Sequence, residues 1–162
     1  MDEKQLLENA KDFCILTGAK IVANPALGYG TDGSVWRTTR GTAVKAFYAD
    51  GNYRDELTCY LRLQKEEINS ICGLAVPSLE GSNDQLMCVE MSIVQRPYLL
   101  DFGKVYIDEY PPYHFDKLAM ANWHAEVREL FEDRTDDVHI ILYRLQKLGI
   151  YYVDPKPANI CF

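Results

Sequence analysis

The feature that most constrains this chain is the string Asp154-Pro155-Lys156-Pro157-Ala158-Asn159, which stands three residues before Phe162. Two prolines this close together fix two backbone φ angles and favour a turn or loop over a helix. The string also places a carboxylate, an ammonium group and a carboxamide side by side. A proline-rich turn near a chain end can be purely structural, so its meaning depends on the segments that precede it.

A glycine-rich segment near the start of the chain has the spacing G-x-G-x-x-G-x-V, formed by Gly28, Gly30, Gly33 and Val35. The β-branched and aromatic residues at 35–38 predict a returning strand, so we expect a hairpin. Glycines let its backbone turn tightly and approach phosphate oxygens closely, with amide N–H groups directed at the negative charge. The hairpin is therefore a candidate phosphate-binding site.

Two further elements follow the hairpin. Segment 42–47 is expected to be a strand, and Lys45 within it carries a compact point charge suited to neutralising phosphate. Segment 53–68 predicts an amphipathic helix, because its apolar residues recur at near-helical spacing: Leu57, Tyr60, Leu61 and Ile68. Glu56 and its neighbour Asp55 lie near the start of this helix, about a third of a turn apart.

The remaining segments predict a mixed α+β chain. Residues 74–79 and 86–91 read as two strands joined by a polar turn. Asp116 can cap a helix that runs to about residue 132, and Asp136 can cap a second helix that ends before Gly149. At the N-terminus the apolar residues have helical spacing and predict an extra helix: Leu6, Leu7, Ala10, Phe13 and Cys14.

In this order the motifs resemble those of the protein kinase superfamily, in particular a small bacterial-type serine/threonine kinase-like protein or pseudokinase. The resemblance covers roughly residues 19–162. It implies a kinase-like α+β fold, in which a five-stranded antiparallel N-lobe sheet with one helix spans 19–90. A truncated, mostly helical C-lobe would span 91–162 and end just after the catalytic loop. Residues 1–18 would form a helical extension that packs on the small lobe.

The resemblance also implies a site for ATP and Mg²⁺. Asp154 would position the acceptor hydroxyl, Lys156 would neutralise the γ-phosphate and Asn159 would hold the metal. Lys45, gripped by Glu56 or alternatively by Asp55, would pair with the α- and β-phosphates. Val89 would close the back of the adenine pocket, and the remaining nucleotide contacts would come from the glycine hairpin and from the backbone of the strand entering the hinge: Gly28, Gly30, Gly33, Val35, Glu90, Met91 and Ser92.

The sequence departs from the family pattern in two places. Tyr152-Val153 stands where kinases usually carry His-Arg before the loop aspartate. Asp101-Phe102-Gly103 spells the kinase metal motif, but it precedes the loop by some fifty residues, whereas the family places it after the loop. We therefore expect Asp101 to be a solvent-exposed or helix-capping carboxylate whose mutation is silent. Only a permuted fold would make it a metal ligand.

With one metal-holding residue unaccounted for, the resemblance favours a pseudokinase. This protein would bind nucleotide, catalyse weak or no phosphotransfer and act through a possible protein partner. The alternative is an active serine/threonine-type protein kinase or a small-molecule phosphotransferase. Its Asp-Phe-Gly segment would be lost by truncation or supplied otherwise.

Composition excludes several other classes of protein. The formal charge of −7 disfavours nucleic acid as a partner. No apolar run is long enough for a membrane span, and the acidic N-terminus is unlike a signal peptide, so we expect a cytoplasmic protein with no membrane contact. Five cysteines without a C-x-x-C pair and three histidines without ligand spacing argue against a disulfide framework and a zinc site.

Overall fold

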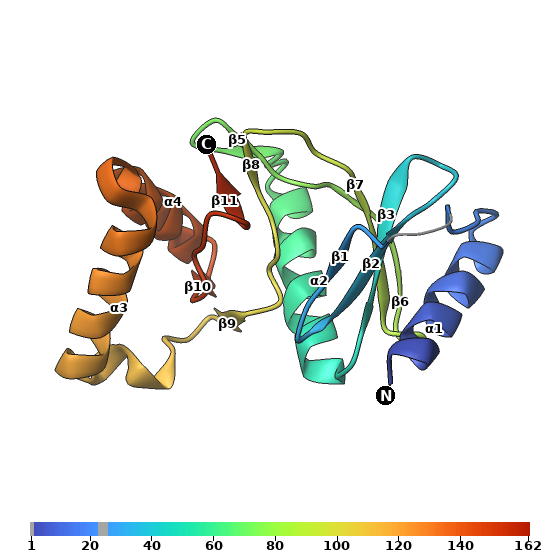
Figure 1. The fold of residues 1–162 in the computed structure, drawn as a ribbon, viewed down its shortest axis with the longest axis horizontal. Coiled ribbons are helices and arrows are strands. Elements are labelled where there is room, and N and C mark those ends of the chain that lie inside the picture. Colours follow the sequence, from blue (N-terminus) through green and yellow to red (C-terminus); the bar gives the residue numbers. More distant parts are fainter. Residues whose placement is uncertain (1, 23–25) are drawn as a thin grey trace.

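The computed structural model describes residues 2–22 and 26–162 as an α+β arrangement (Figure 1). A five-stranded antiparallel sheet has α1 on one face and α2 on the other, and the helices α3 and α4 lie at the opposite end of the molecule. The sheet order is β1-β2-β3-β7-β6. Its strands are β1 Gly28–Tyr29, β2 Gly33–Arg37, β3 Thr42–Phe47, β7 Cys88–Ser92 and β6 Leu79–Asn83. The predicted five-stranded antiparallel sheet is therefore confirmed.

Side-chain alternation along these strands divides the sheet into two faces. In the central pairing, Val35 lies opposite Lys45 and Lys45 lies opposite Val89. These positions face α2, together with Ala43 and Met91. The intervening residues pack against α1 on the other face: Trp36, Val44, Ala46 and Cys88. The hairpin and Lys45 are thereby presented to the same side of the sheet.

Helix α1 (Glu3–Leu16) is the extra N-terminal helix that the sequence predicts. Its first turn is capped by Asp2, whose Oδ1 accepts a hydrogen bond from the Gln5 amide at 2.8 Å. The apolar side is buried against the outer face of the sheet by Leu6, Ala10, Phe13 and Cys14. Burial of this stripe is what holds the helix, because an isolated helix of this length is marginal in water.

Helix α2 (Asp50–Lys65) packs on the inner face through five buried residues: Tyr53, Glu56, Cys59, Tyr60 and Leu63. It begins three residues earlier than the predicted start at 53 and ends before Ile68. The prediction placed Leu61 on the apolar side, but this side chain is exposed. The buried stripe runs instead through Tyr53 and Glu56, and a buried glutamate cannot be recognised from hydrophobic spacing alone.

The second half of the chain contains short strands followed by two helices. A four-stranded sheet has the order β11-β8-β5-β4, and β10 pairs with β9. These strands are β4 Ser70–Ile71, β5 Leu74–Ala75, β8 Tyr98–Leu99, β9 Val105–Ile107, β10 Ile150–Tyr152 and β11 Ile160–Cys161. The helices are α3 Lys117–Phe131 and α4 Thr135–Lys147, with 3₁₀ turns at Pro112–Phe115 and Glu132–Arg134. Of the predicted strand 74–79, only Leu74–Ala75 and the first residue of β6 are extended.

The two predicted helices of this half are present with one correction. Asp116 caps α3, and its Oδ1 accepts hydrogen bonds from the amides of Leu118 and Ala119 at 2.8 and 3.0 Å. Helix α4 begins one residue before Asp136, which lies in its first turn and is not the cap. All five cysteines lie within the described residues, and none is paired. Among the described helices, none has the length and apolar character needed to cross a bilayer.

Candidate functional site

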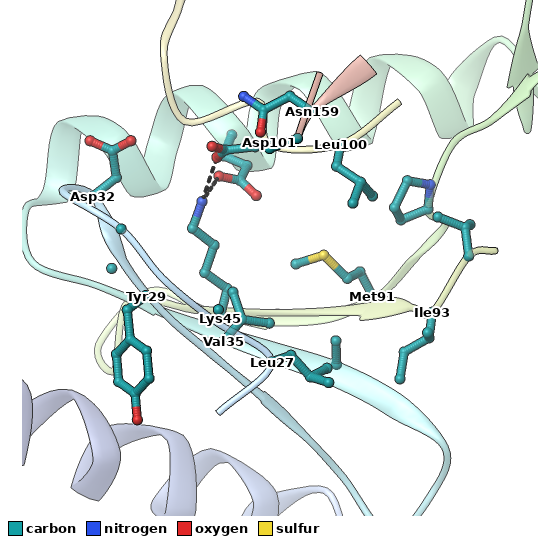
Figure 2. A pocket seen from close by; sticks show the side chains of 18 of the residues that line it. Leu27, Tyr29, Asp32, Val35, Lys45, Met91, Ile93, Leu100, Asp101 and Asn159 are labelled. Atoms are coloured by element: carbon teal, nitrogen blue, oxygen red, sulfur yellow. Dashed lines mark hydrogen bonds and ion pairs between the residues drawn. The ribbon is translucent and has the colours of Figure 1, made fainter. Parts of the chain in front are cut away.

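A cavity of about 450 Å³ opens between the inner face of the five-stranded sheet and the segments 100–104 and 156–159 (Figure 2). Ten of the residues that the sequence assigns to the site line it: Gly28, Gly30, Gly33, Val35, Lys45, Glu56, Met91, Ser92, Lys156 and Asn159. Its size is typical of a pocket for a small organic ligand. The structure therefore gathers in one place residues that lie up to 131 positions apart in the chain.

The centre of the cavity is a buried ion-pair cluster around Lys45. The Lys45 Nζ lies 2.6 Å from Oε2 of Glu56 and 3.0 Å from Oδ1 of Asp101. Glu56 is 1% exposed, and it reaches the lysine from the inner side of α2, so Glu56 and not Asp55 is the partner of Lys45. Burial alone would lower the pKa of Lys45. The charges of Glu56 and Asp101, and the hydrogen bonds to them, outweigh burial and hold that pKa above its ordinary value, so the ammonium stays charged.

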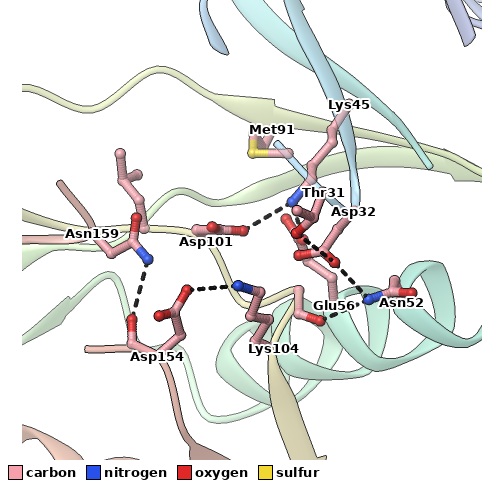
Figure 3. A network of polar contacts seen from close by, with 12 residues as sticks. Thr31, Asp32, Lys45, Asn52, Glu56, Met91, Asp101, Lys104, Asp154 and Asn159 are labelled. Atoms are coloured by element: carbon pink, nitrogen blue, oxygen red, sulfur yellow. Dashed lines mark hydrogen bonds and ion pairs between the residues drawn. The ribbon is translucent and has the colours of Figure 1, made fainter. Parts of the chain in front are cut away.

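The position of Asp101 corrects the prediction made from its place in the sequence. Asp101 caps no helix, since the next helical turn begins at Pro112, and its side chain is 33% exposed and directed at Lys45. The cause is the antiparallel pairing of β8 with β11, in which Leu99 lies opposite Ile160. The amide of Leu100 then donates to the carbonyl of Asn159 at 2.8 Å. Asp101 and Asn159 are consequently neighbours in the cavity (Figure 3).

Asp154 stands at the edge of the cavity, held by two lysines. Its Oδ2 accepts hydrogen bonds from Lys156 Nζ at 2.9 Å and from Lys104 Nζ at 3.1 Å. Partial burial would raise the pKa of Asp154, but these hydrogen bonds and the charges of the two lysines lower it below the ordinary value. The carboxylate is therefore ionised at neutral pH. Asn159 closes the loop, because its Nδ2 donates to the Asp154 carbonyl at 3.3 Å.

Three buried aromatic rings, called here the aromatic column, connect α2, which carries Glu56, with the segments next to Asp101 and Asp154. Phe102, which follows Asp101, makes edge-to-face contacts with Tyr60 of α2 at 5.5 Å and with Tyr152 of β10 at 6.0 Å between ring centroids. The Tyr152 hydroxyl donates to the Leu100 carbonyl at 3.0 Å. All three rings are buried. Tyr152, the departure from the family pattern, thus has a structural role, because it ties the strand before Asp154 to the strand before Asp101.

The glycines of the hairpin serve its own geometry as well as any approach to phosphate. A Cβ on Gly33 would lie 2.1 Å from the Ala46 carbonyl oxygen, so glycine is needed there for the close approach of β2 to β3. The Gly30 amide donates to the Gly33 carbonyl at 2.9 Å and serves the turn. The residues at the tip, Thr31 and Asp32, also line the cavity. Any amide groups directed at a ligand would come from this tip.

Glu90, whose backbone was expected to face the nucleotide, does not line the cavity, and its side chain lies on the other face of the sheet. It lies opposite Val44 in the β3–β7 ladder, and alternation turns its side chain to the face that packs on α1. There the Thr42 hydroxyl donates to its Oε1, and Arg40 Nη2 lies 3.5 Å from Oε2. Val89 does not line the cavity either. Met91 and the residues after it, Ser92, Ile93 and Val94, form this wall.

Three charged residues that sequence reasoning did not assign to the site line the cavity: Asp32, Asp101 and Lys104. Asp101 had a signal, since its motif is spelled out in the sequence and follows the apolar run Tyr98-Leu99-Leu100, which reads as a strand. Lys104 and Asp32 had none, because a lysine after a glycine and an aspartate in a hairpin are ordinary surface residues.

The oxygen donors in the cavity suit a hard divalent cation. Among the described residues there is no cluster of three or more histidine, cysteine or acidic side chains that could hold a metal alone. Magnesium is commonly bound through one or two carboxylates together with substrate phosphates and water. Asp101 offers a carboxylate, and the side-chain oxygen of Asn159 is the atom that its hydrogen bond to Asp154 leaves available. This donor pair fits magnesium on a phosphate ligand.

Comparison of the sequence with protein-family models yields no match, and a search of curated proteins yields no relative.

Proposed function

We propose that this chain is an ATP-binding, magnesium-dependent phosphotransferase of the protein kinase type in which the order of two motifs along the chain is permuted. The observation that supports this most strongly is the meeting of Asp101 and Asn159 through β8 and β11. In the resembled family the Asp-Phe-Gly segment follows the catalytic loop. Here it precedes the loop in sequence but reaches the same cavity. This favours the active alternative over a pseudokinase.

Nucleotide binding is supported by the division of the cavity into an apolar and a charged end. The apolar end has Leu27, Val35, Ala43, Met91 and Ile93, which suit the faces of a flat heteroaromatic base. At the other end three ammonium groups, those of Lys45, Lys104 and Lys156, suit a polyphosphate. Glu56 orients Lys45 along the floor of this charged end.

Each polar residue of the site has a distinct role in this proposal. Asp101 and Asn159 would hold magnesium, which when bound neutralises charge on the phosphate oxygens. Lys156 would contact the phosphate next to the acceptor. Asp154, ionised and aligned by Lys104 and Lys156, would position the acceptor hydroxyl and take its proton. The phosphoryl group would pass to that hydroxyl oxygen as its bond to the nucleotide breaks.

A second candidate is a nucleotide-binding protein without phosphotransfer. It is favoured by the position of Asp154, which does not line the cavity and whose Oδ2 is already bonded to two lysines. The two candidates share the nucleotide site and differ in whether an acceptor reaches Asp154. Release of ADP from ATP in the presence of candidate hydroxyl acceptors separates them, with Asp154→Asn as the inactive reference.

Thermal unfolding with ATP, with and without Mg²⁺, tests nucleotide binding itself. At a hundredfold excess of ligand over its dissociation constant, the native state gains about 2.7 kcal/mol, which raises the melting temperature by roughly 5 to 10 °C for a domain of this size. We expect this shift in the wild type with Mg²⁺, and its loss in Lys45→Ala. Lys147→Ala, which removes an exposed lysine of α4, is the matched control. No shift in the wild type would refute the proposal.

A further inference from the structure

The glycine hairpin carries an acidic residue at the place where a phosphate-binding site would be expected to be neutral or basic. Asp32 lies at the tip of the hairpin and lines the cavity beside Lys45 and Lys104 (Figures 2 and 3). Its carbonyl accepts a hydrogen bond from the Tyr48 amide at 3.0 Å, which fixes its backbone next to the end of β3. The Asp32 side chain thus lies at the cavity on a backbone that this hydrogen bond holds in place.

The Thr31 hydroxyl donates to Asp32 Oδ1 at 3.4 Å, and an amide group of α2 holds the same oxygen more closely. Asn52, in the first turn of α2, donates through Nδ2 to Asp32 Oδ1 at 3.0 Å and to the Gly103 carbonyl at 3.2 Å. The two bonds connect the hairpin tip, α2 and the segment that follows Asp101. The hairpin is thus latched onto the floor of the cavity through Asp32.

Three carboxyl groups border the space beside Gly103. A Cβ built on Gly103 would lie 3.0 Å from Asp32 Oδ2, 3.2 Å from Glu56 Oε2 and 3.4 Å from Asp101 Oδ1. Lys45 is the cation between the last two. Burial raises the pKa of Glu56 and the charge of Lys45 opposes this, while the negative charges of Asp101 and Asp32 raise that pKa further.

The charges that line the cavity disfavour binding of a polyphosphate that carries no metal cation. The cavity is lined by three carboxyl groups and three ammonium groups, and two of those ammonium groups are bonded to Asp154. A ligand with several negative charges would have to enter beside Asp32 with no surplus of positive charge to offset it. A divalent cation bound with the phosphates removes that repulsion.

We propose that Asp32 is a specificity-determining residue that makes the cavity reject phosphate groups not neutralised by a metal cation. The inference rests on the proposed nucleotide site. It adds that this site prefers metal-bound nucleotide to metal-free nucleotide. Removal of the Asp32 charge should strengthen binding, which is the opposite of the effect expected for loss of Lys45, Asp101 or Asn159.

The test is a calorimetric titration of ATP into wild type and Asp32→Asn, once with Mg²⁺ and once with a chelator. Without metal, Asp32→Asn should bind ATP about fivefold to tenfold more tightly than wild type, because a partly buried like charge is removed. With Mg²⁺ the gain should be smaller, about twofold or less. Asp133→Asn, an exposed aspartate of the 3₁₀ turn before α4, changes the net charge equally and should alter neither affinity.

Two results would overturn the inference. A loss of affinity in Mg²⁺ would make Asp32 a metal ligand, and an unchanged affinity without metal would mean that its carboxylate does not face the phosphates. Lys45→Ala separates these failures from failure of the proposed function. If wild type binds ATP and Lys45→Ala does not, the nucleotide site stands whatever Asp32 does, whereas absence of binding in both wild type and Asp32→Asn refutes the site itself.

Discussion

The two walls of the cavity are built in different ways. On the sheet side, the hairpin, Lys45 and Glu56 follow one another within thirty residues, and their order in space follows their order in the chain. On the other side, Asp101 and Asn159 come from segments 58 positions apart, and the pairing of β8 with β11 brings them together. The position of a motif in this molecule therefore follows from the strand that precedes it and from the partner of that strand, and not from its rank along the chain.

The largest loss of stability is expected from a substitution in the aromatic column, which packs the two walls together. Phe102→Ala empties a fully buried position between Tyr60 and Tyr152, so we expect a loss of about 4 kcal/mol in the free energy of unfolding. Chemical denaturation measures it. Phe115→Ala, at a ring that is 79% exposed, is the matched control and should cost little. Equal costs for the two variants would mean that the aromatic column does not hold the walls together.

A smaller effect is expected where α2 meets the second half of the chain. Arg62 Nη1 donates to Asp108 Oδ1 at 2.8 Å and to the Leu148 carbonyl at 2.9 Å, next to β9 and β10 respectively. Arg62→Lys keeps the charge but loses the forked geometry, and the unmade hydrogen bond to the carbonyl should cost about 1 kcal/mol. Arg54→Lys, whose ion pair with Asp50 lies on the exposed face of the same helix, should be indistinguishable from wild type in thermal unfolding.

The smallest expected effect is a pH dependence at Asp154. Its pKa is lower in the folded protein than the ordinary value of 3.8, so its contribution to stability is present above that value and is lost as the pH falls through the folded pKa. Wild type should exceed Asp154→Asn in stability by less than about 1 kcal/mol at pH 6, since the side chains are partly exposed. Unfolding at pH 6 and at pH 3 measures the difference, and a difference that grows toward pH 3 would contradict the assignment.

The sheet-side wall could be predicted from the sequence because its signals are local. Glycine spacing, a lysine within a strand and a helix with an acidic residue near its start all lie within short windows, and the structure brings Gly28, Lys45 and Glu56 to one cavity. The direction of the Glu90 side chain could not be predicted in the same way. Alternation turns the side chain of every second residue away from the cavity, and the phase of that alternation depends on the strand register.

The opposite wall could be predicted only for the loop at 154–159. The position of Asp101 depends on a pairing between two-residue strands, β8 and β11, and such pairings leave no periodic trace in the sequence. The same holds for Lys104, whose bond to Asp154 spans 50 positions. The Asp101-Phe102-Gly103 motif was recognised in the sequence, but because the family places this motif after the loop, Asp101 was expected to lie outside the site.

The most direct test of this account is the affinity for Mg²⁺ in the presence of saturating ATP, measured in wild type, Asp101→Asn and Asn159→Ala. Glu109→Gln, which neutralises an exposed carboxylate just after β9, is the control. If Asp101 and Asn159 share the metal, each variant should lose about tenfold or more in Mg²⁺ affinity, while the control matches wild type. An Asp101→Asn protein that folds and binds Mg²⁺ as wild type does would contradict the central claim that this motif completes the site.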